Sequence, residues 1–288
     1  MIADDAGKKN YLYRYQSLDE KYLNVFSKKE LFFSSPIYLN DPFDCKAFLT
    51  YKNCSIDDLF NYIFFQVKRG KEAKKLPATE EGLRKEALGL LSKVLEDEIL
   101  KGDSSLSQSM EDHKRKFLED ISELGILSLS ERKDDLLMWA HYAAGHTGYC
   151  LEFDKKKLEE WVTSIRETKK FIKLEKVIYN ESYPTLKDYM EYVSRGPGSS
   201  LDELFLLRKS SHWEYEKEWR IIISIDVKDP NSQRYQFPEE MLTGVILGLK
   251  SDHETIIRDH LKTWRQKPKL YYAYKDENKY AVYIKEAD

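Results

Sequence analysis

The spacing of hydrophobic and polar positions changes along the chain. Tyr11–Tyr15 (YLYRY) alternates with period two, which predicts a strand. From residue 55 to 124 the apolar positions recur at i, i+3, i+4 and i+7, which is typical of amphipathic helices. We therefore predict a helical insertion at residues 55–124, with polar connectors, in a core domain made of residues 1–54 and 125–288.

Strand-like and helix-like segments follow residue 124 without a regular period. Alternating or continuously apolar runs predict strands at ILSLSE, YCLEFD, WEYEKEWR with the following IIISIDV, and GVILGL. DDLLMWAHYA predicts a short helix, and LYYAY with YAVYI predicts a hairpin. Because no βαβ repeat is visible, the fold class is α+β.

Composition limits where the protein works. The chain has 288 residues, a net charge of −3, and three cysteines without a CxxC pair. This cysteine usage favours a reducing compartment, the cytoplasm, and argues against a structural zinc site. No stretch approaches the roughly 18 apolar residues of a membrane span, so we expect no membrane partner. The net charge predicts no general attraction to nucleic acid.

The familiar catalytic signatures are missing from the sequence. It contains no GxxxxGKS, GxGxxG, HExxH or GxSxG motif, which disfavours the nucleotide hydrolases, dehydrogenases, zinc proteases and α/β-hydrolases that use them. Cys150 lies in the middle of a predicted strand, where a buried, inert thiol is the common case. Candidate chemistry therefore comes from local clusters of polar and aromatic residues.

Two of these clusters are aromatic. On the opening strand, Tyr13 and Tyr15 share one face and Arg14 lies on the other. The alternative is a packed tyrosine pair with Arg14 reaching solvent. The second cluster surrounds the loop AGHTG, where glycines permit a tight turn. It consists of Trp139, His141, Tyr142 and His146. These histidines either face a ligand or form hydrogen bonds within the fold, and their spacing is weak support for a metal.

The third cluster is acidic. In WEYEKEWR, a strand places Glu214, Glu216, Glu218 and Arg220 on one face. Three like charges at this spacing repel one another unless a cation or a hydroxyl group lies opposite. One interpretation is a ladder of salt bridges at a sheet edge. The other is a carboxylate in a cleft, where it binds sugar hydroxyls or stabilises a developing cation.

Several separated motifs together resemble a known bacterial family. YRY, SSPIYLNDPFD, ILSLSE, LLMWAHYAAGHTGYCLEFD and WEYEKEWR follow one another from Tyr13 to Arg220. This ordered set resembles the family catalogued as domain of unknown function 2971. The helical insertion is the variable part of the pattern. The family name implies a shared fold and no particular reaction.

A second resemblance is to ADP-ribosyltransferase-like proteins. In those proteins the site residues follow one another along the chain in a fixed order. A polar or aromatic group lies on the first core strand, a hydroxyl or aromatic group follows a middle strand, and a glutamate lies on a later strand that is followed by a buried strand. Here the matching positions, in chain order, are Arg14 or Tyr15, Ser130 or Tyr142, Glu216 or Glu218, and GVILGL. The resemblance implies a mixed, mostly antiparallel sheet core with the helical insertion added to it. No Ser-Thr-Ser follows ILSLSE, and which glutamate acts stays open.

This resemblance implies that the protein uses NAD as its substrate and acts as an ADP-ribosyltransferase or an NAD glycohydrolase. It also implies a role as a toxin or a phage-defence effector. Glu216 or Glu218 would stabilise the oxocarbenium-like transition state, as in glycoside cleavage. A ring of Tyr142 or Trp139 would stack on nicotinamide, and Arg14 would contact the pyrophosphate. The acceptor would be a protein or a nucleic acid. The wider expected substrate-binding set is Tyr13, Tyr15, Asn40, Asp41, Ser130, His141, His146 and Arg220.

Two other functions remain open. A metal-dependent nuclease would gather Asp41, Asp44, Glu216 and Glu218 around Mg²⁺ or Mn²⁺. A non-catalytic binding or regulatory domain would use the same clusters for packing. Asn40 and Asp41 precede Pro42 and Phe43, where Asx side chains shape a turn by bonding the backbone.

Overall fold

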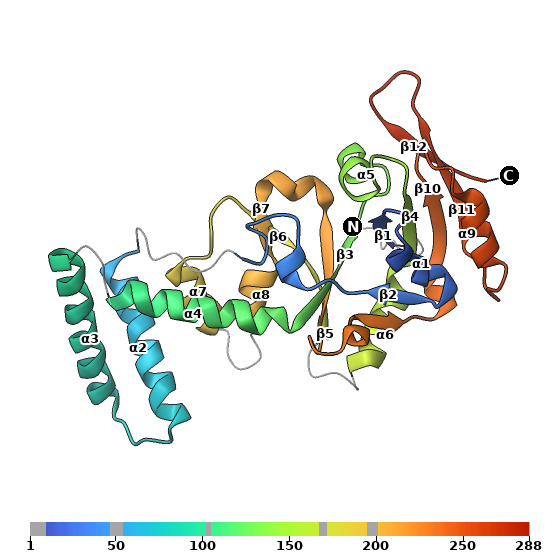
Figure 1. Cartoon of the computed structure of the whole chain (residues 1–288). Coiled ribbons are helices and arrows are strands. Elements are labelled where there is room, and N and C mark those ends of the chain that lie inside the picture. The colour runs from blue at the N-terminus through green and yellow to red at the C-terminus, as the bar shows by residue number, and fades with distance from the viewer. Residues whose placement is uncertain (1–9, 47–53, 102–104, 167–171, 195–200, 288) are drawn as a thin grey trace, which may run out of the picture. The chain divides into compact units, whose positions relative to one another are not determined.

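A computed structural model describes residues 10–46, 54–101, 105–166, 172–194 and 201–287 (Figure 1). These residues form two units. The first contains the chain up to Leu39, Ser122–Tyr179, and the chain from Ser211 onward. The second contains Asn40–Ile121 and Asn180–Ser210. The second unit therefore includes more of the chain than the helical insertion predicted at residues 55–124.

An eight-stranded sheet forms the framework of the first unit. The strand order is β12-β11-β10-β4-β1-β3-β8-β5. Every neighbouring pair is antiparallel except β10 and β11. The predicted α+β class with a mostly antiparallel sheet is thus confirmed. The strands are β1 (Tyr11–Gln16), β3 (Leu124–Ser130), β4 (Tyr149–Asp154), β5 (Ile172–Lys176), β8 (Glu218–Ser224), β10 (Leu242–Leu247), β11 (Lys269–Lys275) and β12 (Val282–Glu286).

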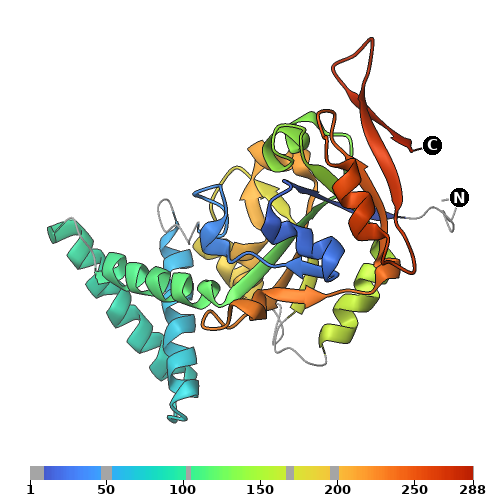
Figure 2. The ribbon, with the colours of Figure 1, turned by 45° about the vertical axis from the view of Figure 1, so that its right-hand side comes forward.

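One face of this sheet carries the main hydrophobic core. Alternate strand residues such as Leu12, Leu151 and Ile221 are fully buried there. Three amphipathic helices contribute apolar residues to the same core (Figure 2). They are α1 (Glu20–Ser27), α6 (Lys155–Arg166) and α9 (Glu254–Leu261). This burial of apolar area is the main force that holds the sheet and helices together.

The opposite face of the sheet carries a smaller core beneath helix α5 (Leu136–Tyr142). The helix begins after Asp135, whose carboxylate accepts hydrogen bonds from the backbone N–H groups of Leu137 and Met138. Trp139 on this helix packs edge-on against Tyr15, with ring centroids 5.1 Å apart. Because β4 is buried on both faces, apolar residues occupy most of its positions and not only every second one.

Short elements complete the first unit. Strand β2 (Glu30–Phe32) pairs antiparallel with β9 (Arg234–Gln236). The 3-10 helix Ser211–Glu216 precedes β8. Further short elements are β6 (Ile178–Asn180), whose first two residues belong to this unit, and the 3-10 helices Pro36–Tyr38, Pro230–Gln233 and Glu239–Met241.

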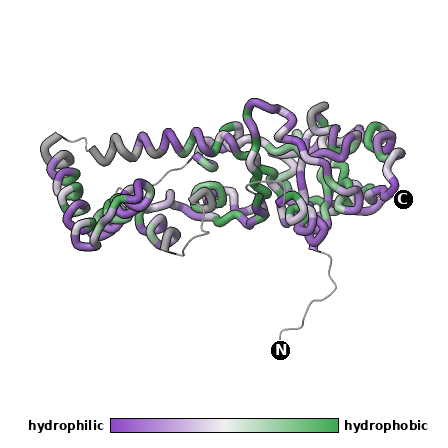
Figure 3. Tube along the Cα trace, turned by 90° about the horizontal axis from the view of Figure 1, so that it is seen from below, coloured by the Kyte–Doolittle hydropathy of each residue, from purple (hydrophilic) through white to green (hydrophobic). Residues whose placement is uncertain are grey.

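The second unit is helical. Its buried residues include Leu59, Ile63, Ala87 and Leu91, at the helical spacing that the sequence predicts. Along the described parts of these helices hydrophilic and hydrophobic residues are interspersed (Figure 3). Across the described ranges, no helix is both long enough and apolar enough to span a membrane. The elements are α2 (Ile56–Ala73), α3 (Glu80–Lys101), α4 (Ser105–Ser122), α7 (Leu186–Ser194), α8 (Leu201–Leu206) and β7 (Arg208–Ser210).

We expect Gly148→Ala to destabilise the first unit by about 2–3 kcal/mol, because a Cβ there would lie 2.1 Å from the carbonyl oxygen of Gln16. The end of β1 would have to move. All five tryptophans lie in the first unit, so urea unfolding followed by tryptophan fluorescence measures the effect. The control is Tyr280→Ala in the same unit, because this ring is fully exposed. An equal loss of stability in both variants would contradict the expectation.

Candidate functional site

The pairing register aligns polar side chains across the centre of the sheet. Glu152 on β4 pairs with Tyr13 on β1, Tyr13 pairs with Ser130 on β3, and Ser130 pairs with Glu218 on β8. Paired residues point to the same side of a sheet, so these four side chains share the face that bears α5. We call them the polar row. Its two carboxylates are three strand spacings apart, or about 14 Å.

At one end of the polar row, Glu218 forms a buried ion pair with Arg220. The guanidinium donates from Nε to Oε1 at 2.8 Å and from Nη2 to Oε2 at 2.9 Å. Both side chains are almost completely buried, with exposed fractions of 1% for Arg220 and 4% for Glu218. This two-point geometry is typical of a strong, fixed charge pair. Glu218 is therefore neutralised by a cation of the same strand.

Glu216 lies outside the strand that the sequence predicts for it. Residues 211–216 form a 3-10 helix, and β8 begins only at Glu218. Between them Lys217 has a positive φ of 44°, which breaks the alternation of an extended chain. The prediction that Glu214, Glu216, Glu218 and Arg220 share one strand face is therefore wrong for the first two.

Two of the predicted site residues meet at Glu216. The hydroxyl of Tyr142 donates to its Oε1 at 2.6 Å, and the hydroxyl of Ser130 donates to its backbone oxygen at 2.6 Å. Glu216 is 2% exposed, whereas the Tyr142 side chain is partly exposed. A short hydrogen bond to a carboxylate is stronger than one between neutral groups. The arrangement fixes a carboxylate next to the polar row.

The other aromatic and histidine candidates surround Trp139. Its indole is fully buried and donates to the backbone oxygen of Lys133 at 3.0 Å. The ring of His146 stacks on it, with centroids 6.2 Å apart. Ala144, Gly145 and His146 all have positive φ, so the loop turns as tightly as its glycine predicts. Burial, and then Lys250, lower the pKa of His146. His141 is exposed.

The opening strand divides its candidates between the two faces. Tyr13 and Tyr15 lie on the face of the polar row, and Tyr15 donates to the backbone oxygen of Arg132 at 2.9 Å. Arg14 points to the opposite face. It donates to the backbone oxygens of Ser128 at 3.0 Å and Phe32 at 3.4 Å, and burial lowers its pKa to about 10. Arg14 therefore does not face the same side of the sheet as Glu218.

Asn40 and Asp41 belong to the second unit. The carboxylate of Asp41 accepts a hydrogen bond from the backbone N–H of Phe43 at 2.8 Å, which is the local turn bond expected of an Asx side chain. Asp44, in the same unit, forms a buried ion pair with Lys209 at 3.4 Å. Among the described residues, no group of three or more His, Cys, Asp or Glu side chains is arranged to hold a metal ion.

Sequence reasoning missed Glu152. This carboxylate is 5% exposed and accepts hydrogen bonds from Thr243 at 2.9 Å and Tyr13 at 3.4 Å. Burial first, and Glu152 second, raise the pKa of Tyr13 well above its ordinary value. The only signal in the sequence is one acidic residue inside the apolar run YCLEFD, which resembles an ordinary solvent-facing position.

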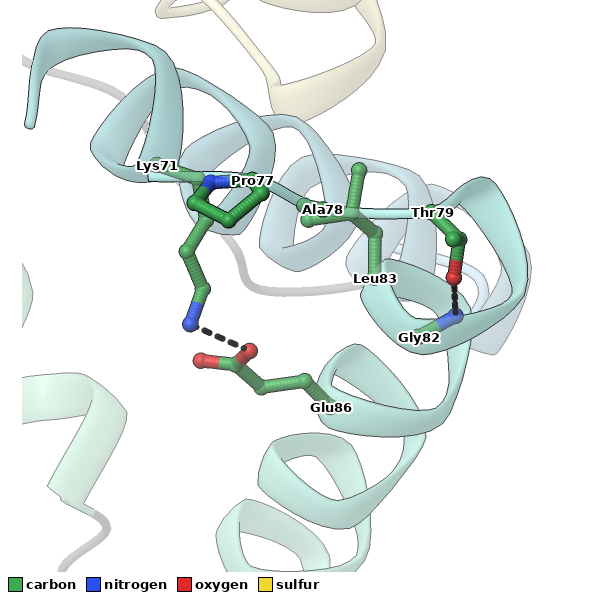
Figure 4. A pocket seen from close by; sticks show the side chains of 7 residues that line it. All are labelled: Lys71, Pro77, Ala78, Thr79, Gly82, Leu83 and Glu86. Atoms are coloured by element: carbon green, nitrogen blue, oxygen red, sulfur yellow. Dashed lines mark hydrogen bonds and ion pairs between the residues drawn. The ribbon is translucent and has the colours of Figure 1, made fainter. Parts of the chain in front are cut away.

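The second unit contains a surface hollow near the connection between α2 and α3 (Figure 4). Within it Lys71 forms an ion pair with Glu86 at 3.1 Å, and the N–H of Gly82 donates to Thr79 at 3.2 Å. None of the predicted site residues lines this hollow. The lining residues are Lys71, Pro77, Ala78, Thr79, Gly82, Leu83 and Glu86.

Residues 138–221 match the family described as protein of unknown function (DUF2971). The matched segment runs from α5 through β4 to the first half of β8, so it contains Tyr142, Glu152, Glu216 and Glu218. This match confirms the resemblance to that family over residues 138–221. No curated protein and no solved structure matches the chain.

Proposed function

We propose that this protein cleaves NAD at the bond between nicotinamide and ribose, as an ADP-ribosyltransferase or an NAD glycohydrolase. The observation that supports this most is the Tyr142–Glu216 contact at 2.6 Å beside the polar row. A carboxylate fixed in this way suits the stabilisation of positive charge on a sugar. In this proposal the sheet is related to ADP-ribosyltransferase-like folds, which share its order of a polar first strand, a hydroxyl and a glutamate.

The reaction breaks the bond between C1′ of the ribose and the ring nitrogen of nicotinamide. The electron pair of that bond goes to the nitrogen, and the ribose becomes oxocarbenium-like, as in glycoside cleavage. A nucleophile then bonds to C1′ and releases its proton to the solvent. Water as the nucleophile gives hydrolysis, and a protein or nucleic-acid group gives ADP-ribosyl transfer. NAD is the nucleotide partner in either case.

In this scheme Glu216 faces the developing charge. Tyr142 is a positioning residue that orients the carboxylate, and Ser130 fixes its backbone. In this proposal the ligand would approach Glu216 past Tyr142, whose side chain is partly exposed. The ion-paired Glu218 and Arg220 brace the adjacent strand instead of reacting. Consumption of NAD in the cytoplasm would suit a toxin or phage-defence effector.

Glu216→Gln is expected to reduce nicotinamide release from NAD by about 100-fold or more, because the amide cannot stabilise positive charge as a carboxylate does. Tyr142→Phe should cause a smaller loss, since it keeps the carboxylate but removes the group that orients it. Release is measured chromatographically on the purified full chain. Glu214→Gln is the matched control, because this neighbouring glutamate is exposed and pairs with Lys217 at 2.9 Å.

Urea unfolding of each variant, followed by tryptophan fluorescence, separates lost chemistry from lost folding. The proposal is overturned if the wild-type protein releases no nicotinamide and also transfers no label from radioactive NAD to protein or nucleic acid in a lysate. Equal activity of Glu216→Gln and Glu214→Gln would remove Glu216 from the role given to it.

A further inference from the structure

The acid at the other end of the polar row has a different environment from Glu218. Glu152 lies on central strand β4 and is buried, yet its described hydrogen-bond donors are the neutral hydroxyls of Thr243 and Tyr13. Within the described ranges it forms no ion pair, whereas Glu218 is neutralised by Arg220. A buried carboxylate with only neutral donors keeps a strong attraction for positive charge.

Two tyrosine rings surround this carboxylate. Tyr13 lies beside it on β1, and Tyr271 approaches from β11 across Gly244. A Cβ at Gly244 would come within 2.8 Å of the Tyr271 ring and 3.2 Å of Glu152 Oε1. The missing side chain at Gly244 therefore lets the ring and the carboxylate approach each other. We call Glu152, Tyr13 and Tyr271 the cation cradle.

A cation of the chain itself already lies at this cradle. Lys133 Nζ is 5.9 Å from the centroid of the Tyr13 ring and 6.0 Å from that of Tyr271. These distances are at the limit of a cation–π interaction. Lys133 forms no ion pair in the part of the chain that the structure describes. The indole of Trp139 donates to the backbone oxygen of Lys133, so displacement of the Lys133 side chain would not itself remove that hydrogen bond.

We infer that the cation cradle binds a planar aromatic cation of the ligand, and that Lys133 occupies this place until the ligand displaces it. Ring faces and a carboxylate together favour a flat, positively charged group over a neutral one of the same shape. The identification of this cation as the nicotinamide ring of NAD rests on the proposed function. Glu152 and Ser130 are two strand spacings apart, about 10 Å, which a nucleoside can bridge.

The test compares two small probes on the purified full chain. One is 1-methylnicotinamide, a permanent planar cation, and the other is nicotinamide, its neutral counterpart. Isothermal titration calorimetry should show that the wild-type protein binds the cation at least about 10-fold more tightly. Glu152→Gln should abolish this preference. Lys133→Ala should strengthen binding of the cation several-fold, because the competing ammonium is gone and the backbone oxygen held by Trp139 is kept.

The opposite signs of these two changes exclude a merely structural effect, since a damaged site would lose affinity in both variants. Lys217→Ala and Glu214→Gln are the controls, because they alter an exposed pair on the same unit and should leave both affinities unchanged. Equal binding of the two probes by the wild-type protein overturns the inference. So does a Lys133→Ala variant that binds the cation no more tightly than the wild-type protein.

Failure of this inference and failure of the proposed function give different results. If 1-methylnicotinamide is preferred but NAD is never cleaved, the cradle is supported and the proposed reaction is wrong. If NAD is cleaved and Glu152→Gln retains both the wild-type rate and the wild-type preference between probes, the cradle is overturned and the reaction stands.

Discussion

Replacing Arg220 with leucine should cost the first unit about 3–5 kcal/mol, because it leaves the carboxylate of Glu218 buried without the guanidinium that neutralises it. Typical domains are stable by about 5–15 kcal/mol, so this loss would remove a large share of the free energy of unfolding. The fully buried Arg220 side chain contributes to the damage through its volume as well as its charge. Urea unfolding followed by tryptophan fluorescence measures the change.

The double variant Glu218→Leu/Arg220→Leu separates these two contributions. It removes the uncompensated charge and should recover part of the stability lost in Arg220→Leu. Lys217→Ala, which breaks an exposed pair one residue before β8, is the control and should cost at most about 1 kcal/mol. If Arg220→Leu is no less stable than Lys217→Ala, the ion pair is not the buried anchor described above.

Trp139→Ala should cost about 3–5 kcal/mol, the usual effect of removing a fully buried indole. The cavity would lie between Tyr15 on the sheet and the ring of His146. The variant also loses the hydrogen bond that fixes the backbone of Lys133. Thermal unfolding gives the stability loss, and titration with 1-methylnicotinamide gives the effect on the cation cradle.

Trp139→Phe distinguishes packing from hydrogen bonding at this position. Phenylalanine fills much of the space but has no N–H, so we expect a smaller stability loss together with a change in cation binding. Tyr280→Ala is the control, because this ring is fully exposed. A Trp139→Ala variant as stable as Tyr280→Ala would contradict the enclosed position of the indole.

Local patterns in the sequence were sufficient for much of the fold. Helix α5 follows from the Asp135 cap and the apolar residues after it, and the β11–β12 hairpin follows from two aromatic strands around a polar turn. These elements depend on residues close together in the chain. The same holds for the turn at Asp41, which the Asx pattern indicates.

The candidate site was less predictable because it depends on the pairing of distant strands. Arg14 and Glu152 each look like ordinary polar positions in a strand. Alternation along β1 already predicts that Arg14 lies opposite Tyr13 and Tyr15, but only the register of β1 with β3 and β4 puts Glu152 in the polar row. In WEYEKEWR the period-two pattern continues across Lys217, where the backbone leaves the extended conformation. No hydropathy pattern reveals this change of conformation.

The central position of β1 has a consequence for synthesis of the chain. β1 ends at Gln16, but its neighbours β3 and β4 begin at Leu124 and Tyr149. Roughly 100 residues, including α2 and α3, must leave the ribosome before β3 becomes available. At ordinary elongation rates that delay is on the order of 5 to 20 seconds. During this interval the nascent β1 lacks both of its sheet neighbours, so its backbone N–H and C=O groups stay open to pairing with another chain.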